Sequence, residues 1–463
     1  MQDVTVGLDI GTTSVKAVAV NEDGEVVGRA RVPHGVNTPT PGAFEHDLDQ
    51  AWRSGVVEAL TRAVRDAHDV KVAAVNVAAM VPSLGAVNAG GRALGPGLLY
   101  GDKRGERVAD STRPGDSGEL LGFLAWHAEQ HPDAHGFWPA QAVANHALCG
   151  VGAIDSSTAM TAHPLFDYTQ WDSDLAKEAG ASVEQLPTIV AGYNPAGTIT
   201  DGVAAGALVG PGTIDAFGEQ LVAGADNAGD VLVLCGTTLI TWGVIEEEAH
   251  VDGLSPASAG GLWTIPHTAR GKLLVGGPSN AGGLFLEWAK RWIGTDPATA
   301  AAVTPDDLPV WLPYVRGERT PLHRRDLRAS LHDAALHHSP EHLMRAAYEA
   351  SAFVVRHHID LGRNAGLSPT RIVATGGGTR DDLWMRALAD CTGLPVEVAA
   401  SPEGAAVGSA FMARCVAGLE KSTRDAARWA RSIRTIEPDA AWVDPASARY
   451  ERFRALTAEA CAQ

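Results

Sequence analysis

Two stretches of the chain share one pattern of apolar and polar positions. Residues 4–10 and 15–20 are mostly apolar, and residues 11–13 between them read Gly-Thr-Thr. The same order returns at 231–245, where Gly-Thr-Thr occupies 236–238. Apolar runs on either side of a glycine-led turn predict a β-hairpin. Recurrence half a chain apart predicts two domains of similar design.

The remaining pattern alternates helices with strands. Apolar residues at 48, 52, 56 and 60 have helical spacing and predict a helix over 47–68, capped by Asp47 or Asp49. Two or three strands in a meander are predicted over 4–30. Further strands are predicted at 70–79, 205–210, 272–276 and 371–375, and a hairpin over 84–100. Helices are predicted at 216–224, 284–293, 340–364, 383–391 and 403–415, and residues 105–165 are expected to be helical and irregular. This alternation indicates an α/β protein.

The turn before the second Gly-Thr-Thr hairpin suggests a domain boundary. We therefore expect an N-terminal domain over 1–226 and a C-terminal domain over 227–463. Residues 439–463 are predicted to be largely helical. They would pack on the core or on a partner subunit in a homodimer, and the sequence leaves both open.

The composition indicates which binding partners are disfavoured and which cell compartment is expected. A net charge of −18 argues against nucleic acids and anionic membranes as partners. No signal peptide and no membrane-spanning apolar run are recognised, so a cytoplasmic protein is expected. The five cysteines are scattered without CxxC spacing, which disfavours a disulfide framework or structural zinc. Two pairs of adjacent histidines, at 337–338 and 357–358, would not share a helix face, so a metal site is not expected there.

The first Gly-Thr-Thr turn has the residue types of a nucleotide phosphate site. Gly11 lets backbone approach an anion, and Thr12 and Thr13 add hydroxyl donors. Asp9 lies at the strand end, where its oxygens can hold Mg²⁺. The second copy has Cys235 in the place of Asp9, so only the first half would supply the metal carboxylate. A plain hairpin turn would explain one copy, but not the recurrence.

Asp215 is the candidate general base. It follows a Gly-Thr-Ile segment and precedes a predicted helix, so its carboxylate can accept the proton of a substrate hydroxyl. The same position is typical of a helix N-cap. Both roles are compatible, because a helix N-terminus helps to keep the carboxylate ionised. Asp226 is a rival, but it lies too close to the second phosphate strand for an intervening helix, which favours a turn role.

Three glycine-rich junctions between strand and helix follow, at 276–283, 376–378 and 404. Together with the second Gly-Thr-Thr turn they would place several helix N-termini around one anion. The glycine triplet at 376–378 also leaves space for a flat base. Asp381 and Asp382 are expected to cap the next helix, with a nucleotide contact as the second interpretation. No GxxxxGK[ST] motif is present, so none of these is a P-loop.

With these motifs the chain resembles the FGGY family of carbohydrate kinases, of the xylulokinase-like kind. The matching segments are 8–17, 99–104, 212–217, 234–238, 313–321, 375–384 and 403–410. The resemblance implies an α/β fold of two ribonuclease-H-like (actin-like ATPase) domains, with mixed sheets flanked by helices and the active site in the cleft between them. It also implies ATP-dependent phosphorylation of a sugar or polyol hydroxyl with Mg²⁺.

The resemblance assigns roles residue by residue. Asp215 would be the catalytic base and Asp9 would organise Mg²⁺. The phosphate loops would be formed by Gly11, Thr12, Thr13 and Lys16 in the first half and by Gly236, Thr237 and Thr238 in the second. The remaining nucleotide contacts would be Gly283, Glu287, Gly377, Gly378 and Asp381. The substrate pocket would contain Val81, Pro82, Asp102 and Arg104 together with Asp215.

The chain also departs from standard xylulokinases. Residues 79–83 read Ala-Met-Val-Pro-Ser where a Gln-Met-His block is usual, and Tyr100 replaces a Trp. The segment before Asp215 is shorter than usual, and residues 328–333 lack the customary glycines. A ketopentose such as D-xylulose is the expected substrate, with another ketose, a sugar acid or a polyol left open. An actin- or chaperone-like ATPase and a silent sugar sensor are the rival functions. The chain ends too soon for a chaperone's extra substrate-binding region, and Asp9 and Asp215 argue against a sensor.

Overall fold

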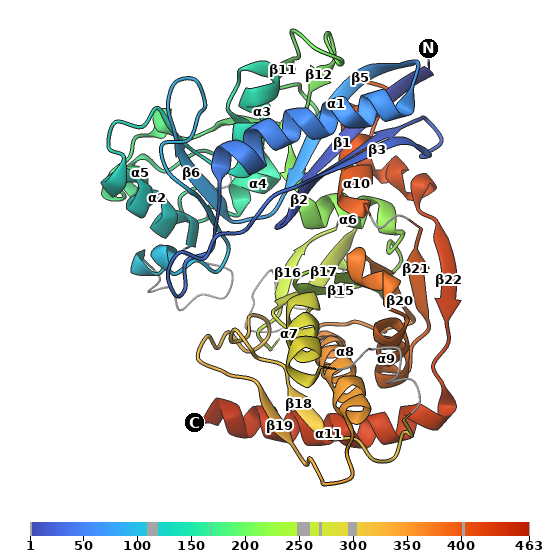
Figure 1. The fold of residues 1–463 in the computed structure, drawn as a ribbon. Helices are drawn as coiled ribbons and strands as arrows, with labels where there is room; N and C mark the ends of the chain where they lie inside the picture. The colour runs from blue at the N-terminus through green and yellow to red at the C-terminus, as the bar shows by residue number, and fades with distance from the viewer. Residues whose placement is uncertain are drawn as a thin grey trace. The chain divides into compact units, whose positions relative to one another are not determined.

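The computed structural model describes residues 2–108, 119–167, 169–247, 260–267, 271–294, 303–400 and 403–462. The chain forms two compact units (Figure 1). The first comprises Met1–Val222 with Glu403–Trp429, and the second Ala223–Pro402 with Ala430–Gln463. A single boundary at 226/227 would assign all later residues to the second domain, whereas the segment 403–429 packs with the first unit. Within the described residues, no helix combines the length and hydrophobicity needed to cross a bilayer.

The first unit is built on a mixed sheet that carries the first Gly-Thr-Thr turn. Its strand order is β11-β12-β5-β1-β2-β3, with β13 also paired to β5. The strands span Gln2–Ile10 (β1), Ser14–Val20 (β2), Val26–Pro33 (β3), Val70–Ala79 (β5), Gly197–Thr198 (β11), Leu208–Val209 (β12) and Thr213–Ile214 (β13). The hairpin and the strand at 70–79 are confirmed. The strand expected at 205–210 is observed as β12, and after a break Thr213–Ile214 also pairs with β5 in parallel.

Helices cover both faces of this sheet. Leu8 packs in the same apolar cluster as residues of α1 (Gly55–Ala67). A Cβ added to the neighbouring Gly7 would lie 1.8 Å from the carbonyl oxygen of Ala406 in α10 (Gly404–Val416). Since successive strand residues point to opposite faces, α1 and α10 lie on opposite sides. The expected helix over 47–68 begins as a π-helical segment, Asp49–Ser54 (η1), and Asp47 accepts a hydrogen bond from the Gln50 amide at 3.0 Å.

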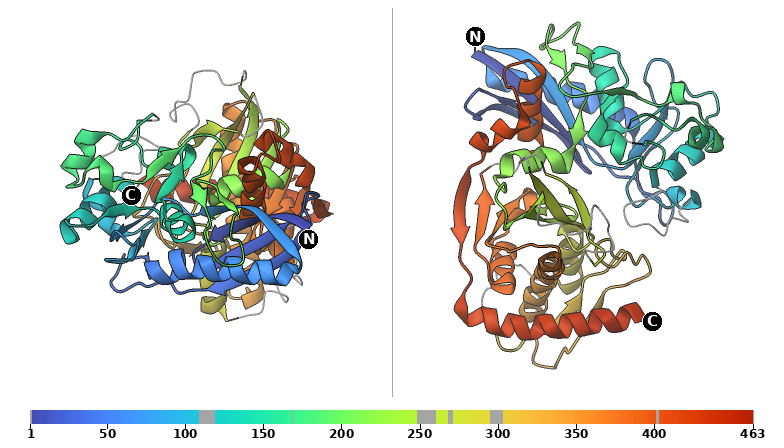
Figure 2. Two further views of the ribbon diagram at one scale, coloured as in Figure 1. Left: turned by 90° about the horizontal axis from the view of Figure 1, so that it is seen from above. Right: turned by 180° about the vertical axis from the view of Figure 1, so that it is seen from behind.

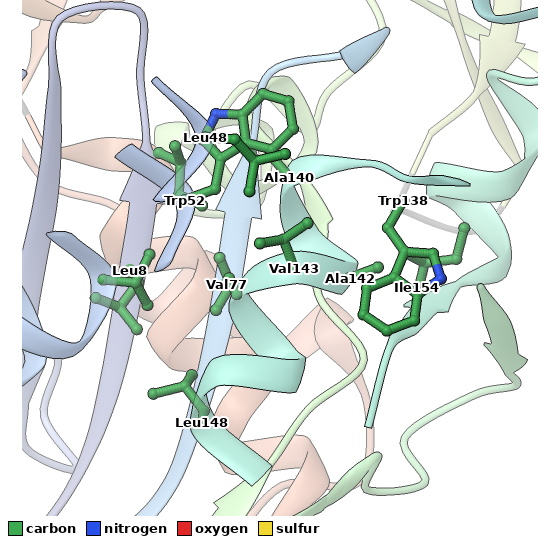
Figure 3. Packing of buried hydrophobic residues seen from close by; sticks show 14 of the residues in the cluster. Leu8, Leu48, Trp52, Val77, Trp138, Ala140, Ala142, Val143, Leu148 and Ile154 are labelled. Carbon is green, nitrogen blue, oxygen red and sulfur yellow. The ribbon is translucent and has the colours of Figure 1, made fainter. Parts of the chain in front are cut away.

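A second layer extends the first unit. A small sheet in the order β4-β7-β6-β8 comprises Glu45–His46, Gly97–Leu99, Ser83–Val87 and Gly136–Trp138, so the hairpin over 84–100 is confirmed. The segment 105–165 contributes strands β8 and β9 (Ala153–Asp155) beside α2 (Glu119–Gln130), α3 (Ala140–Cys149) and α4 (Ser156–Met160). Strand β10 (Thr188–Val190) pairs with β9, and α5 spans Ser173–Glu178. Figure 3 shows Leu8 and Val77 of the large sheet, Trp52 of the π-helical segment, and Val143 and Leu148 of α3 meeting in one apolar core.

The second unit repeats the arrangement of the first. Its sheet has the order β16-β17-β15-β14-β20-β21-β22. In both units an antiparallel hairpin (β1–β2, β14–β15) has a third antiparallel strand on one side and a parallel strand on the other. The predicted repeat is therefore confirmed. The strands span Asp230–Cys235 (β14), Leu239–Glu246 (β15), Trp263–Pro266 (β16), Lys272–Ser279 (β17), Arg371–Thr375 (β20), Val396–Ala399 (β21) and Ser432–Ile436 (β22).

Helices of the second unit pack on this sheet and on one another (Figure 2). They are α7 (Gly283–Ile293), α8 (Pro340–Asn364), α9 (Asp382–Thr392) and α11 (Ala440–Ala462), beside the short strand pair β18 (Val310–Leu312) and β19 (Ser330–His332). The predicted C-terminal helix is confirmed as α11. Tyr450 and Phe453 of α11 are buried in the core of this unit, so the helix packs on its own chain. All five cysteines are free thiols.

Candidate active site

A buried ion pair anchors the first turn. Asp9 and Lys16 face each other across the β1–β2 hairpin, and Lys16 Nζ lies 2.9 Å from Asp9 Oδ2. Asp9 is 4% exposed. Its charge is the main cause that raises the pKa of Lys16, with smaller contributions from Glu219 and Asp215 in the same direction. The structure thus brings the predicted metal carboxylate, the predicted phosphate-loop lysine and the predicted base into one electrostatic cluster.

Asp215 is the first residue of α6 (Asp215–Ala223), directly after β13. Its Oδ1 accepts a hydrogen bond from the Ala216 amide at 2.7 Å, so the carboxylate lies at the helix N-terminus, where an anion is stabilised. Glu219, one turn further along α6, faces the same side. Glu219 was not among the predicted site residues, although its i+4 spacing from Asp215 could have indicated it.

The donor set of this cluster suits Mg²⁺. Three carboxylates, those of Asp9, Asp215 and Glu219, act on the single ammonium of Lys16, which leaves two net negative charges. In the described part of the chain, Oδ1 of Asp9 has no hydrogen-bond partner. Mg²⁺ takes one or two carboxylates and completes its shell with water and phosphate oxygens. These residues therefore fit the ion that the sequence predicts.

Buried amide side chains hold the segment that leads to Asp215. From α3, Gln141 Nε2 donates to the Thr213 carbonyl at 3.1 Å, and Asn145 Nδ2 donates to the Pro211 carbonyl at 2.9 Å. From β5, Asn76 Oδ1 accepts from the Gly212 amide at 2.9 Å. These residues were not predicted. Their signal in the sequence is two amides four residues apart in a helix of small apolar residues.

The first Gly-Thr-Thr turn presents free donors. The Gly11 amide closes the turn on the Ser14 carbonyl at 3.1 Å. Within the described part of the chain, the amides of Thr12 and Thr13 have no protein acceptor, whereas both carbonyls are occupied. His46 Nε2 lies 2.8 Å from the Thr12 oxygen, and the His34 amide donates to the Thr13 oxygen at 3.0 Å. An anion in front of this turn would meet unpaired N–H groups.

Asp102 and Arg104 form a second polar cluster in this unit. Arg104 contacts Asp102 through Nε at 2.9 Å and through Nη2 at 2.6 Å, and Nη2 also reaches Glu45 at 2.6 Å. The Phe44 amide donates to Asp102 at 2.6 Å. Two carboxylates around one guanidinium leave one net negative charge. The hydroxyls of Tyr100 and Thr12, 3.1 Å apart, join this region to the phosphate turn.

Val81 has a largely apolar environment. Val81 lines a cavity of about 20 Å³ with apolar residues of α2 and with Phe137 and Trp171. This volume has room for one water molecule and none for a sugar. The apolar replacement noted in the sequence is thus packed against an apolar wall. The role of Val81 and Pro82 in binding substrate stays a prediction.

The second Gly-Thr-Thr turn is hydrogen-bonded to the first residues of α7. The amides of Gly283 and Leu284 donate to the carbonyls of Gly236 at 2.9 Å and Thr237 at 3.0 Å. A Cβ on Gly283 would lie 2.8 Å from the Gly236 oxygen, and one on Gly282 would lie 2.4 Å from the Thr238 carbonyl carbon. These glycines are required for the close approach of helix and turn.

Glu318 fixes the loop between β17 and α7. It is fully buried, and its carboxylate accepts hydrogen bonds from Ser279 Oγ at 2.8 Å, the Asn280 amide at 3.0 Å and the Arg319 amide at 2.7 Å. Burial raises the pKa of Glu318 to about 7 in spite of these hydrogen bonds. The role of this glutamate within the matching segment 313–321 was not predicted.

The titration of Glu318 has a measurable consequence for stability. An unfolded glutamate has a pKa of about 4.3. Between that pH and about 7 the native state binds a proton that the unfolded state lacks, so stability falls as the pH rises through this window. We expect the wild type to lose up to about 3 kcal/mol relative to Glu318→Gln between pH 5 and pH 8. Urea unfolding of both proteins at each pH measures this, and parallel pH profiles would contradict it.

In the glycine triplet after β20, one glycine borders free space and another is packed against a side chain. A Cβ on Gly377 would meet nothing within 4 Å, whereas one on Gly378 would lie 2.3 Å from the Trp384 ring. Gly377 therefore leaves open space beside the backbone, as a flat ligand requires. Asp381 caps α9 by accepting from the Leu383 amide at 3.2 Å, which confirms the capping prediction for this residue.

Lys290 joins two of the predicted nucleotide residues. Its Nζ lies 3.3 Å from Glu287 and 3.4 Å from Asp381, over the ring of Tyr348. Glu287 is otherwise exposed, with 65% of its side chain accessible. Lys290 was not predicted, although it lies one helical turn after Glu287. Nucleotide contacts by Glu287 and Asp381 stay predictions.

The third glycine junction, at Gly404, begins α10 and lies in the first unit. That the three junctions surround one anion stays a prediction. The rival base Asp226 lies in the second unit, where its Oδ1 is 3.8 Å from His267 Nε2.

Among the described residues, one group has the composition of a metal site: Asp307, His337 and His338. His338 Nδ1 accepts from the Ala335 amide at 2.9 Å, so a neutral His338 carries its proton on Nε2, facing Asp307. Hydrogen bonds thus account for this cluster.

Both halves of the chain match domain models of one protein family. The model of the N-terminal domain of FGGY carbohydrate kinases matches residues 4–120, and that of the C-terminal domain matches residues 233–417. The xylulose kinase of Escherichia coli K12 is 26% identical over 481 residues, covering 97% of this chain and 98% of the relative. The gluconokinase of Bacillus subtilis 168 is 23% identical over 462 residues, covering 90% and 88%.

The fold agrees with a solved relative. The crystal structure of xylulose kinase from Rhodospirillum rubrum is similar with a TM-score of 0.80 and 27% identity, covering 98% of each chain. The mixed sheets flanked by helices are those of the actin-like ATPase fold. With two domain models matched in order over more than half of its length, the chain belongs to the FGGY family of carbohydrate kinases, which phosphorylate sugars with ATP.

Proposed function

We propose that this sugar kinase phosphorylates a neutral ketose, with a ketopentose such as D-xylulose as the first candidate, and that Asp215 is its general base. The observation that carries the proposal is the cluster of Asp9, Lys16, Asp215 and Glu219 beside a hydroxyl-rich turn with unpaired amides. A base, a cation and an anion-binding turn are the parts that phosphoryl transfer to an alcohol requires.

In this proposal Asp215 accepts the proton of the attacking hydroxyl. A phosphoryl transition state is loose, so the base is needed as the new bond forms and its pKa need not be raised. The α6 N-terminus stabilises the negative charge of the carboxylate, and the side-chain amides of Gln141 and Asn145 in α3 fix the segment before it. The amides of Thr12 and Thr13 bind phosphate oxygens. Mg²⁺ held by Asp9 would supply charge neutralisation for the phosphates.

The charge of the Asp102 cluster favours a neutral substrate. Asp102 and Glu45 outnumber Arg104, and the guanidinium is paired with both carboxylates. A sugar acid would bring another negative charge to this surplus, and like charges in a part-buried region repel. Sugar hydroxyls, in contrast, donate readily to carboxylates. The relatives include gluconokinases as well as xylulose kinases, so this prediction distinguishes a sugar-acid substrate from a neutral ketose.

A panel of acceptors tests the proposal. ADP release from Mg·ATP is measured with D-xylulose, L-xylulose, D-ribulose, xylitol, glycerol and D-gluconate. We expect kcat/KM for one ketopentose to exceed that for gluconate by about 100-fold or more, the scale set by unpaired charge or hydrogen-bond partners in a binding site. A preference for gluconate would contradict the neutral-substrate assignment. An absence of stimulation by every acceptor would favour a sensor.

A further inference from the structure

We propose that His46 is a positioning residue for the first phosphate turn, held by Trp52 in the one tautomer that donates a hydrogen bond to the Thr12 carbonyl. This inference rests on the proposed function, because it assigns to the Gly11–Thr13 turn the binding of phosphate. Neither His46 nor Trp52 belongs to a motif that was assigned to the site from the sequence.

Three groups form a hydrogen-bonded chain that ends at the turn. The Trp52 indole nitrogen lies 2.9 Å from His46 Nδ1, and His46 Nε2 lies 2.8 Å from the Thr12 carbonyl oxygen. Both side chains are fully buried. Trp52 comes from the π-helical segment before α1, and His46 from β4. Two elements outside the β1–β2 hairpin therefore supply the hydrogen bonds that hold the backbone of its turn.

The chemistry of the partners fixes the proton. An indole N–H is only a donor and a carbonyl oxygen is only an acceptor. His46 must then accept at Nδ1 and carry its hydrogen on Nε2. A second proton on Nδ1 would break the contact with Trp52, so the ring is kept neutral. The pKa of His46 is lowered by burial to about 4, in agreement with this state.

The neighbours of the His46 ring are a second histidine and a glutamate that is paired elsewhere. The His34 ring packs edge-on against His46, with the centroids 4.5 Å apart, and burial lowers its pKa as well. Glu45, the neighbouring residue on β4, is directed to Arg104 instead. His46 therefore acts as a fixed neutral donor, and the Thr12 carbonyl is its acceptor.

Holding this carbonyl has a consequence for phosphate binding. A peptide carbonyl and the next amide belong to one rigid plane, so fixing the Thr12 oxygen also fixes the direction of the Thr13 N–H. That N–H is one of the unpaired donors of the turn. Strand β4 contributes His46 to the phosphate turn and Glu45 to the Asp102–Arg104 cluster, so a single short element positions both regions.

Variants at His46 separate a hydrogen-bonding role from simple filling of space. In His46→Leu the Thr12 carbonyl and the Trp52 N–H lose their partner, and we expect kcat/KM for Mg·ATP to fall about 10- to 100-fold, mainly through KM, because misplacement of a binding group is costly. His46→Gln offers an amide N–H and a carbonyl in one side chain, so it should restore kcat/KM to within about 3-fold of wild type.

A matched control is available in the same unit. His127 is also fully buried and its Nε2 lies 3.2 Å from the Leu84 carbonyl, without contact to the turn. His127→Leu should lower stability and leave KM for Mg·ATP unchanged. An equal rise of KM in both leucine variants, or an unchanged KM in a folded His46→Leu, would overturn the proposal. So would a His46→Gln variant as impaired as His46→Leu.

Two readouts do not need an active enzyme. Calorimetry with Mg²⁺ and a non-hydrolysable ATP analogue should show weaker binding to His46→Leu than to His46→Gln or wild type, even if no sugar in the panel is phosphorylated. Long-range ¹H–¹⁵N NMR of the His46 ring should show only the Nε2–H tautomer in wild type and a mixture in Trp52→Phe. An Nδ1–H tautomer or a protonated ring at pH 7 would overturn the inference and leave the kinase proposal standing.

Discussion

Replacing Asp215 with Asn is expected to lower kcat by about 10³-fold or more and to leave the affinity for ATP within about 3-fold of wild type. An asparagine keeps the size and the contact with the Ala216 amide, but it cannot take the proton of the attacking hydroxyl. Steady-state kinetics with the responding sugar, together with calorimetric titration of ATP, measure both quantities.

The matched control for this variant is Asp226→Asn. Asp226 is the rival carboxylate in the sequence, and the structure places it beside His267 in the second unit. We expect this variant to keep kcat within a few-fold of wild type. If Asp226→Asn lost turnover and Asp215→Asn kept it, the assignment of the base would be wrong.

Replacing Asp9 with Asn is expected to lower kcat by about 10²- to 10³-fold and to shift the Mg²⁺ requirement to higher concentration. The variant loses the carboxylate charge that pairs with Lys16, and the ion loses a charged ligand. Removal of this charge should also lower the pKa of Lys16, since Asp9 is the main cause of its elevation.

Manganese binding gives a readout of this variant that is independent of turnover. Electron paramagnetic resonance with Mn²⁺ and ADP should show weaker metal binding in Asp9→Asn. Asp3→Asn is the control, because Asp3 lies exposed on the same strand, away from the turn. Wild-type metal affinity in Asp9→Asn would show that the ion is held elsewhere.

The repeated hairpin was the part of the fold that the sequence predicted best. Short apolar strands around Gly-Thr-Thr have a strong local signal, and both copies formed with the same neighbours in the sheet. The long helix at 340–364 and the strand at 371–375 were also predicted to the residue. Each of these is long or strongly periodic, so few alternatives compete.

Elements with weak local signals were missed. Strands β21 and β22 exist because they pair with β20 and with each other, which no local pattern specifies. The placement of α10 with the first unit depends on Gly7, whose lack of a side chain lets Ala406 approach β1. Such a contact joins residues some four hundred positions apart, and periodicity carries no information about it.

The sequence predicted the charged residues and glycines of the candidate site, but not the side chains that hold its backbone in place. Asp9 and Asp215 were recognisable because they border a turn and a helix start, whereas Lys16 was assigned from the resemblance to the family. Gln141, Asn145, His46 and Trp52 lie within ordinary helical or strand patterns, and their role appears only when their backbone partners are known. Positioning residues of this kind act through tertiary contacts that a single sequence does not display.

The central claim is that ATP is used to phosphorylate a sugar and not to drive conformational work. The most direct measurement is ³¹P NMR of the wild-type reaction with Mg·ATP and the sugar that responds in the panel. We expect one phosphomonoester signal for each ADP formed and little inorganic phosphate. With Asp215→Asn we expect neither ADP nor phosphomonoester to accumulate. Formation of ADP and inorganic phosphate without a phosphomonoester would contradict it and identify an ATPase.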